Sequence, residues 1–237
     1  MEKLKINNLE NKLNSWNQKR LQIDTIVDGL GTPIDENIKD TVVALQISGV
    51  QTTSSHEGKV GHYPIPYVDI ESHEAEGLMN RYSEECMQLI SQEERDLRKE
   101  RDILLQQWRL IDNPEDLEYQ RIEGRLDEVA DALAAFPRVT SETSKKIKDQ
   151  LLESNRLAEY KISQLLENFY SSRAKHDEYE LVLKPVGMLG AVRLLPKNYE
   201  HQEQELDEIR ILERLKQYQA EMRAFTDYIK QQYIAHK

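Results

Sequence analysis

The segment VQTTSSHEGKVGHYPIPYVDIE, residues 50–71, is where helical periodicity gives way to strand character. Residues 50–54 are rich in β-branched side chains, and residues 67–71 mix apolar with acidic side chains. Both patterns are typical of short strands. Between them, residues 52–62 combine hydroxyl-bearing side chains with two glycines, which is typical of a polar loop. The segment therefore predicts a strand, a loop and a second strand.

Helices are predicted on the N-terminal side of this segment. Thr32 offers a capping hydroxyl, and Pro33 suits the first helical position. Apolar residues then recur every three to four positions until Gly49, which suits a left-handed residue at a helix end. We therefore expect one helix over residues 33–48. Another amphipathic helix is expected over residues 2–28.

Helical periodicity dominates the C-terminal side as well. It predicts a long helix over residues 73–111, a second over 117–135 and a third that Thr140 or Ser141 could cap. Strand character returns in two short stretches around a glycine-containing turn, and a last long helix follows. The strands are expected at residues 179–183 and 191–195, and the helix at 200–233. An isolated hairpin is marginal in water, so its strands should join the earlier pair.

These elements predict an α+β protein with long α-helices and a small, about four-stranded sheet. Residues 1–72 and 177–237 are expected to form the α+β domain, and residues 73–176 an inserted helical hairpin or bundle. The last helix spaces its apolar residues by threes and fours, as a coiled-coil seam does. It therefore predicts a homo-oligomer assembled through long helices.

Composition limits the possible partners and compartments. The 237 residues carry a formal net charge of -11, which disfavours non-specific binding to nucleic acid. The single cysteine, Cys86, cannot form an intramolecular disulfide and fits a reducing compartment. No stretch approaches the roughly 18 apolar residues of a membrane span. We therefore expect a cytoplasmic protein without a membrane partner.

The polar loop is the candidate ligand site. Its backbone amides, hydroxyls and one lysine could surround a phosphate or carboxylate. The first glycine of the nucleotide-binding pattern Gly-x-x-x-x-Gly-Lys-Ser/Thr is missing, so a loop of that class is not indicated. We expect an anionic small molecule, such as a nucleotide, to bind there without a catalytic residue. The expected ligand-binding residues are Thr53, Ser54, Ser55, His56, Glu57, Gly58 and Lys59.

Two other functions remain open at this point. His56 and His62 could ligate a divalent metal as a cofactor, with Glu57 as general base of a metal-dependent hydrolase. Two histidines in a loop lack the fixed spacing of strong metal motifs. The chain could also be a structural helical adaptor in which the loop binds nothing.

Residues 38–70 resemble a loop of poorly characterised bacterial and phage proteins. The resemblance is carried by Thr-x-Ser-Ser-x-Glu-Gly and a following Pro-Tyr-Val-Asp-Ile strand. More distantly, residues 54–59 are similar to the Ser-Ser-Cys-Ser-Gly-Arg loop of the wybutosine-synthesis methyltransferase family, which acts on tRNA. Three of the six positions differ, His56, Glu57 and Lys59. The similarity implies that the loop is a site and leaves methyl transfer as a hypothesis.

Overall fold

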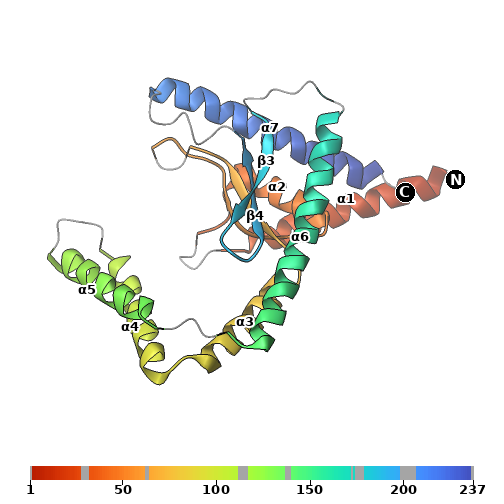
Figure 1. Ribbon diagram of the computed structural model, residues 1–237. Helices are drawn as coiled ribbons and strands as arrows, with labels where there is room; N and C mark the ends of the chain where they lie inside the picture. Colours follow the sequence, from red (N-terminus) through yellow and green to blue (C-terminus); the bar gives the residue numbers. More distant parts are fainter. Residues whose placement is uncertain are drawn as a thin grey trace. The chain divides into compact units, whose positions relative to one another are not determined.

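The computed structural model describes residues 2–27, 32–61, 64–111, 117–136, 140–171, 173, 179–197 and 207–235. Within these ranges the chain forms seven helices and one four-stranded antiparallel sheet (Figure 1). The predicted α+β class, with long helices and a small sheet, is confirmed. None of the described helices combines the length and apolarity that crossing a membrane requires.

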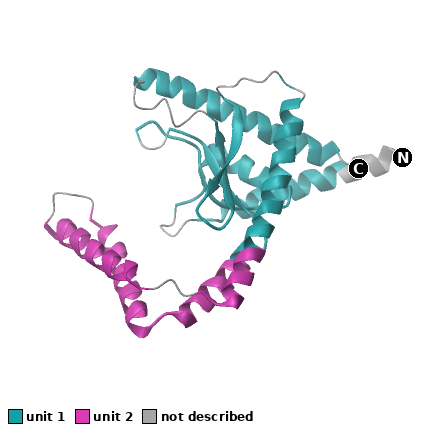
Figure 2. Ribbon diagram, in the orientation of Figure 1, with its two compact units in different colours: residues 1–76, 151–237 teal, residues 77–150 magenta. Residues whose placement is uncertain are grey.

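The chain divides into two compact units (Figure 2). Unit 1 comprises residues 1–76 and 151–237, and unit 2 comprises residues 77–150. Unit 2 is shorter at its C-terminal end than the insertion expected at residues 73–176. The difference arises because helix α6 (Glu142–Ser171) runs out of unit 2 and packs its C-terminal half into the core of unit 1.

Unit 1 contains the whole sheet. Its strands are β1 (Gln51–His56), β2 (Tyr67–Glu71), β3 (Leu181–Val186) and β4 (Ala191–Pro196), in the order β1-β2-β4-β3. The hairpin of β3 and β4 thus joins the earlier strand pair, as the marginal stability of an isolated hairpin predicts. Strands β1 and β3 form the two edges of the sheet. The register of β1 with β2 shifts between Thr52 and Ser54, which marks a β-bulge.

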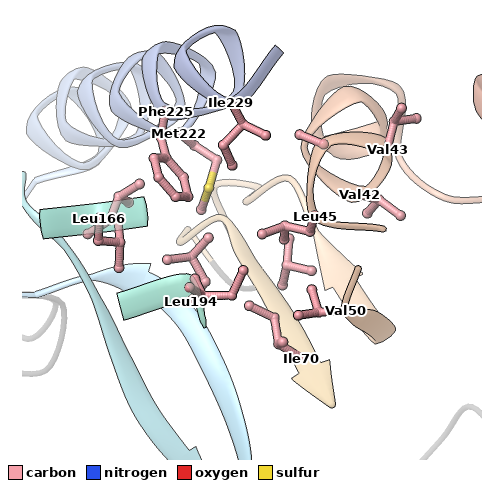
Figure 3. Packing of buried hydrophobic residues seen from close by; sticks show 14 of the residues in the cluster. Val42, Val43, Leu45, Val50, Ile70, Leu166, Leu194, Met222, Phe225 and Ile229 are labelled. Atoms are coloured by element: carbon pink, nitrogen blue, oxygen red, sulfur yellow. The ribbon is translucent and has the colours of Figure 1, made fainter. Parts of the chain in front are cut away.

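Helices cover one face of the sheet and bury it. Ile70 and Leu194 project from this face into a core that includes Leu45 of α2 (Glu36–Ile47) and Phe225 of α7 (Glu208–Ala235) (Figure 3). Val68 belongs to the same core. Helix α1 (Glu2–Asp24) adds apolar side chains to the same core. Because side chains alternate along a strand, the neighbouring residues of β2 and β4 lie on the opposite face. Those residues include Tyr67, Asp69 and Arg193.

The start of α2 differs from its prediction. The helix begins at Glu36, and Asp35 occupies the N-cap position without a side-chain capping bond. Pro33, expected at the first helical position, instead pairs with Val27 in an isolated antiparallel bridge. At the other end, Gly49 has φ of 81°, which confirms the expected left-handed residue.

Unit 2 contains the helical hairpin of α4 (Gln92–Trp108) and α5 (Leu117–Ala134). The prediction of one continuous helix over residues 73–111 is wrong, because α3 (Ala75–Leu89) ends before α4 begins. Ser91 caps the new helix, since its hydroxyl accepts a hydrogen bond from the Glu94 N–H at 3.1 Å. The Ser-x-x-Glu spacing of a capping box was the sequence signal for this break. Ser141 caps α6 in the same way, accepting from the Ser144 N–H at 2.9 Å.

Candidate functional site: a pocket beside strand β1

The first part of the predicted loop is a strand. Residues 52–56 belong to β1 and pair with β2, so their backbone is extended and does not curl around an anion. The chain turns only after His56, where Gly58 and Gly61 have φ of 83° and 86°. The expectation of successive amides that wrap a ligand is therefore wrong for residues 52–56. His62 lies outside the described residues.

A pocket of about 420 Å³ nevertheless adjoins these residues. It lies between β1, the C-terminal half of α2 and the segments that precede α2 in sequence. Five of the seven expected ligand-binding residues line the pocket, whereas Glu57 and Gly58 do not. Hydroxyls and an amide form much of the polar lining, and aliphatic side chains form the rest. The lining residues are Ile26, Val27, Thr32, Pro33, Ile34, Asp35, Val42, Gln46, Thr52, Thr53, Ser54, Ser55, His56 and Lys59.

Glu57 holds the turn against the N-terminus of α2. Its carboxylate accepts hydrogen bonds from the Asn37 backbone N–H at 3.2 Å and from Asn37 Nδ2 at 2.9 Å. Its own N–H donates to Asp35 Oδ2 at 3.3 Å. A carboxylate at this place satisfies a helix N–H that has no partner within the helix, and it suits the positive end of the helix dipole. The Glu57 carboxylate is thus a helix cap supplied from outside the helix, and the Glu57 carbonyl accepts a further hydrogen bond from Gln219 Nε2 at 2.9 Å.

Gly58 is buried where two segments meet. A Cβ atom at this position would lie 2.5 Å from Leu215 Cδ1 and 3.0 Å from the backbone carbon of Ile65. The positive φ of Gly58 also disfavours any side chain. Gly58 therefore shapes the turn and makes no part of the pocket wall.

Lys59 supplies the cation of the pocket, and it has a partner in the described structure. Its Nζ lies 3.1 Å from Asp35 Oδ1, and the side chains are 51% and 20% exposed. The hydrogen bond to Asp35 raises the pKa of Lys59, and the charges of Asp35 and Glu57 act in the same direction. Lys59 is therefore charged throughout the neutral range. Such an exposed pair contributes little to stability, so a competing anion could displace Asp35 at small cost.

His56 joins β1 to a polar array on the face of the sheet opposite the core cluster. Its Nδ1 accepts the Gly58 N–H at 2.9 Å, and its ring lies nearly parallel to that of Tyr67 at 6.0 Å. The Arg193 guanidinium lies 3.9 Å from the Tyr67 ring centroid and makes two hydrogen bonds with Asp69, at 2.6 and 2.9 Å. Sequence reasoning missed Arg193, although it is the one charged residue in the apolar run of β4.

The metal hypothesis stays a prediction. Among the residues that the structure describes, no three His, Cys, Asp or Glu side chains converge as a metal site. His56 Nδ1 and the Glu57 carboxylate are used in the hydrogen bonds given above, and the second proposed ligand, His62, is not among these residues. The geometry thus assigns both described candidates to local structure.

Comparisons with protein-family models, with curated proteins and with solved structures gave no match. The resemblances of the 52–62 segment therefore remain expectations. A fold class alone does not define a function, so the function has to be sought in the residues of the pocket.

Proposed function

We propose that this protein binds a small anionic molecule, of the class of a nucleoside monophosphate, in the pocket beside β1. One observation supports the proposal. Five residues whose polar groups suit an anionic ligand line the same pocket, namely Thr53 to His56 and Lys59. Its volume of about 420 Å³ falls within the range of roughly 300 to 1,000 Å³ that is usual for small-molecule sites.

The lining suits a ligand with a charged end and a partly apolar body. Lys59 would attract the anion, and the serine and threonine hydroxyls of β1 would donate hydrogen bonds to it. Ile26, Val27 and Ile34 would contact the body of the ligand. Asp35 opposes anion binding, so Lys59 has to exchange its carboxylate partner for the ligand.

Isothermal titration calorimetry with AMP, adenosine and inorganic phosphate tests the proposal. We expect AMP to bind at one site per chain and more tightly than adenosine. Lys59→Ala should weaken AMP binding about tenfold or more, since a charge-assisted hydrogen bond contributes roughly 1.5–3 kcal/mol.

Lys197→Ala is a matched control for this experiment. The Lys197–Glu180 pair has a similar separation, 3.4 Å, and its side chains are 50% and 16% exposed, close to the values of the Lys59–Asp35 pair. Lys197 does not line the pocket, so its replacement should leave AMP binding unchanged. Absence of saturable heat with AMP and phosphate, or an equal loss in both variants, would contradict the proposal.

An adaptor role is the second candidate, and it is compatible with ligand binding. Large apolar side chains of the α4–α5 hairpin are exposed, namely Ile103 at 56% and Leu110 and Leu117 at 83% each. Where such side chains form one contiguous patch, they mark a surface that contacts another chain. The homo-oligomer expected from the sequence would be one form of this role, with the exposed side chains in contact between copies of the chain. Sedimentation velocity should then give a mass above 27.8 kDa, and Leu110→Lys with Leu117→Lys should return it to the monomer.

A further inference from the structure

A second hollow of about 310 Å³ lies elsewhere in unit 1. It is formed at the C-terminal end of α2, the C-terminal half of α6 and the last turns of α7. Aliphatic side chains and two tyrosines lie among amides, a serine and a lysine around it. The lining residues are Ile47, Ser48, Lys161, Gln164, Leu165, Asn168, Tyr228, Ile229, Gln232 and Tyr233.

The charge of this hollow differs from that of the whole chain. The chain carries a net charge of -11, yet none of the lining residues is acidic. Lys161 is the only cation in the lining, and within the described ranges no carboxylate pairs with it. The pocket beside β1 differs here, because its lysine is already paired with Asp35. An anion entering the second hollow would therefore displace no described ion pair.

The Lys161 ammonium lies next to Gly49. A Cβ atom at residue 49 would lie 2.6 Å from Lys161 Nζ, so the amino group lies close against the backbone of Gly49. The ammonium thus sits just beyond the C-terminus of α2, where the negative end of the helix dipole favours a positive charge. The charge therefore lies beside the hollow.

Further hydrogen-bond donors surround the same hollow. The side-chain amides of Asn168 and Gln232 and the hydroxyl of Tyr228 make no hydrogen bond to any other described residue. The Tyr228 ring is positioned by Phe169, with ring centroids 5.5 Å apart. Below these groups, Ile229 is buried, and Ile47 and Leu165 are partly buried. Polar donors at the rim and an apolar floor are the usual composition of a small-molecule site.

We propose that this hollow is a second binding site, for the carboxylate of a molecule with an apolar body. Lys161 pairs with the carboxylate, and the amides of Asn168 and Gln232 donate hydrogen bonds to its oxygens. The aliphatic floor contacts the apolar body. A single ammonium balances one negative charge, so a monoanion fits better than a phosphate dianion. This site is separate from the one beside β1, and the two share no lining residue.

Isothermal titration calorimetry of the full chain with 2-naphthoate, 2-naphthamide and 2-naphthyl phosphate tests this site. We expect 2-naphthoate to bind most tightly of the three. Lys161→Ala should weaken its binding about tenfold or more, because one charge-assisted contact is lost. Lys161→Arg should retain most of the binding, since the cation is kept.

Two variants provide the controls. Lys146→Ala removes an exposed lysine from α6 outside the hollow and should leave 2-naphthoate binding unchanged. Lys59→Ala should also leave it unchanged, which separates this site from the one beside β1. The proposal is overturned if 2-naphthoate does not bind saturably, if the amide or the phosphate binds as tightly, or if Lys161→Ala has no larger effect than Lys146→Ala.

Discussion

Gly58 meets two constraints that can be separated by experiment. Gly58 and Gly61 have nearly equal positive φ, but a Cβ at residue 61 would meet no atom within 4 Å. We expect Gly61→Ala to cost only the left-handed strain, about 1–2 kcal/mol. Gly58→Ala should cost that strain and a further 1–3 kcal/mol or so, because Leu215 and the Ile65 backbone must move. Urea denaturation compares the two variants, and equal losses of unfolding free energy would contradict the packing account.

Glu71 makes the stability of unit 1 depend on pH. Burial raises the pKa of this carboxyl above its ordinary value of 4.5, and the nearby Asp69 charge adds to the rise. A raised folded-state pKa means that the folded state binds the proton more tightly than the unfolded state does. The stabilising contribution is complete below about pH 4.5 and is lost as the pH rises through the folded-state pKa.

Glu71→Gln should therefore raise the denaturation midpoint at pH 7 and lose this advantage below pH 4.5. Urea denaturation at both pH values measures the effect. Glu74→Gln, at an exposed position three residues further on, is the control and should match the wild type at both. A Glu71→Gln variant that is equally stabilised at low pH would show that burial of the charge is not the cause.

At the scale of elements, α2 depends on a cap from another part of the chain. Glu57→Ala removes the acceptor of the Asn37 N–H and should lower the unfolding free energy by about 1 kcal/mol, as for other helix caps. Thermal or urea denaturation measures this loss. Glu167→Ala, on the exposed side of α6, should change stability much less. If both variants unfold alike, Glu57 does not stabilise α2.

Periodicity predicted the elements well where their own residues form them. The end of α2 at Gly49, the Ser141 cap of α6 and the β3–β4 hairpin all follow from local residue types. The start of α2 could not be predicted in this way, because its cap comes from Glu57, some twenty residues away. The break at Ser91 had a local signal, but the apolar periodicity on both sides concealed it.

The candidate site shows the same division. Hydroxyls, histidine and lysine identified one wall of the pocket from residue type alone. The opposite wall comes from residues 26–35 and α2, and nothing in the segment itself indicates that they lie against it. The ion pair of Lys59 with Asp35 is likewise a tertiary contact. Residue types therefore predicted the polar groups of one wall of the pocket. The residues that lie against this wall could be found only from the structure.

On the scale of the whole molecule, the two units differ in their cores. Unit 1 buries a large apolar cluster that joins its sheet to helices α1, α2, α6 and α7. In the described part of unit 2 the buried apolar side chains are few: Leu78, Ile122, Val129 and Ile147. Regions with few buried apolar contacts open at lower free energy.

Hydrogen exchange followed by mass spectrometry should show this difference. Peptides from α4 and α5 should exchange well before peptides from α2, β2 and β4, because unit 2 can open while unit 1 stays folded. Peptides from α1, a helix of unit 1, serve as an internal comparison and should be protected where Trp16 and Ile23 are buried. Equal protection throughout would mean that the chain opens as a single cooperative unit.

A titration of ¹⁵N-labelled protein with AMP tests anion binding in the pocket beside β1 most directly. We predict saturable shifts of the backbone amides of residues 52–56 and of Gln46, with little change in α5 of unit 2. Lys59→Ala should reduce these shifts at equal AMP concentration, and Lys197→Ala should not. Shifts that do not saturate, or that spare β1 while other residues respond, would contradict the assignment of this pocket as an anion site.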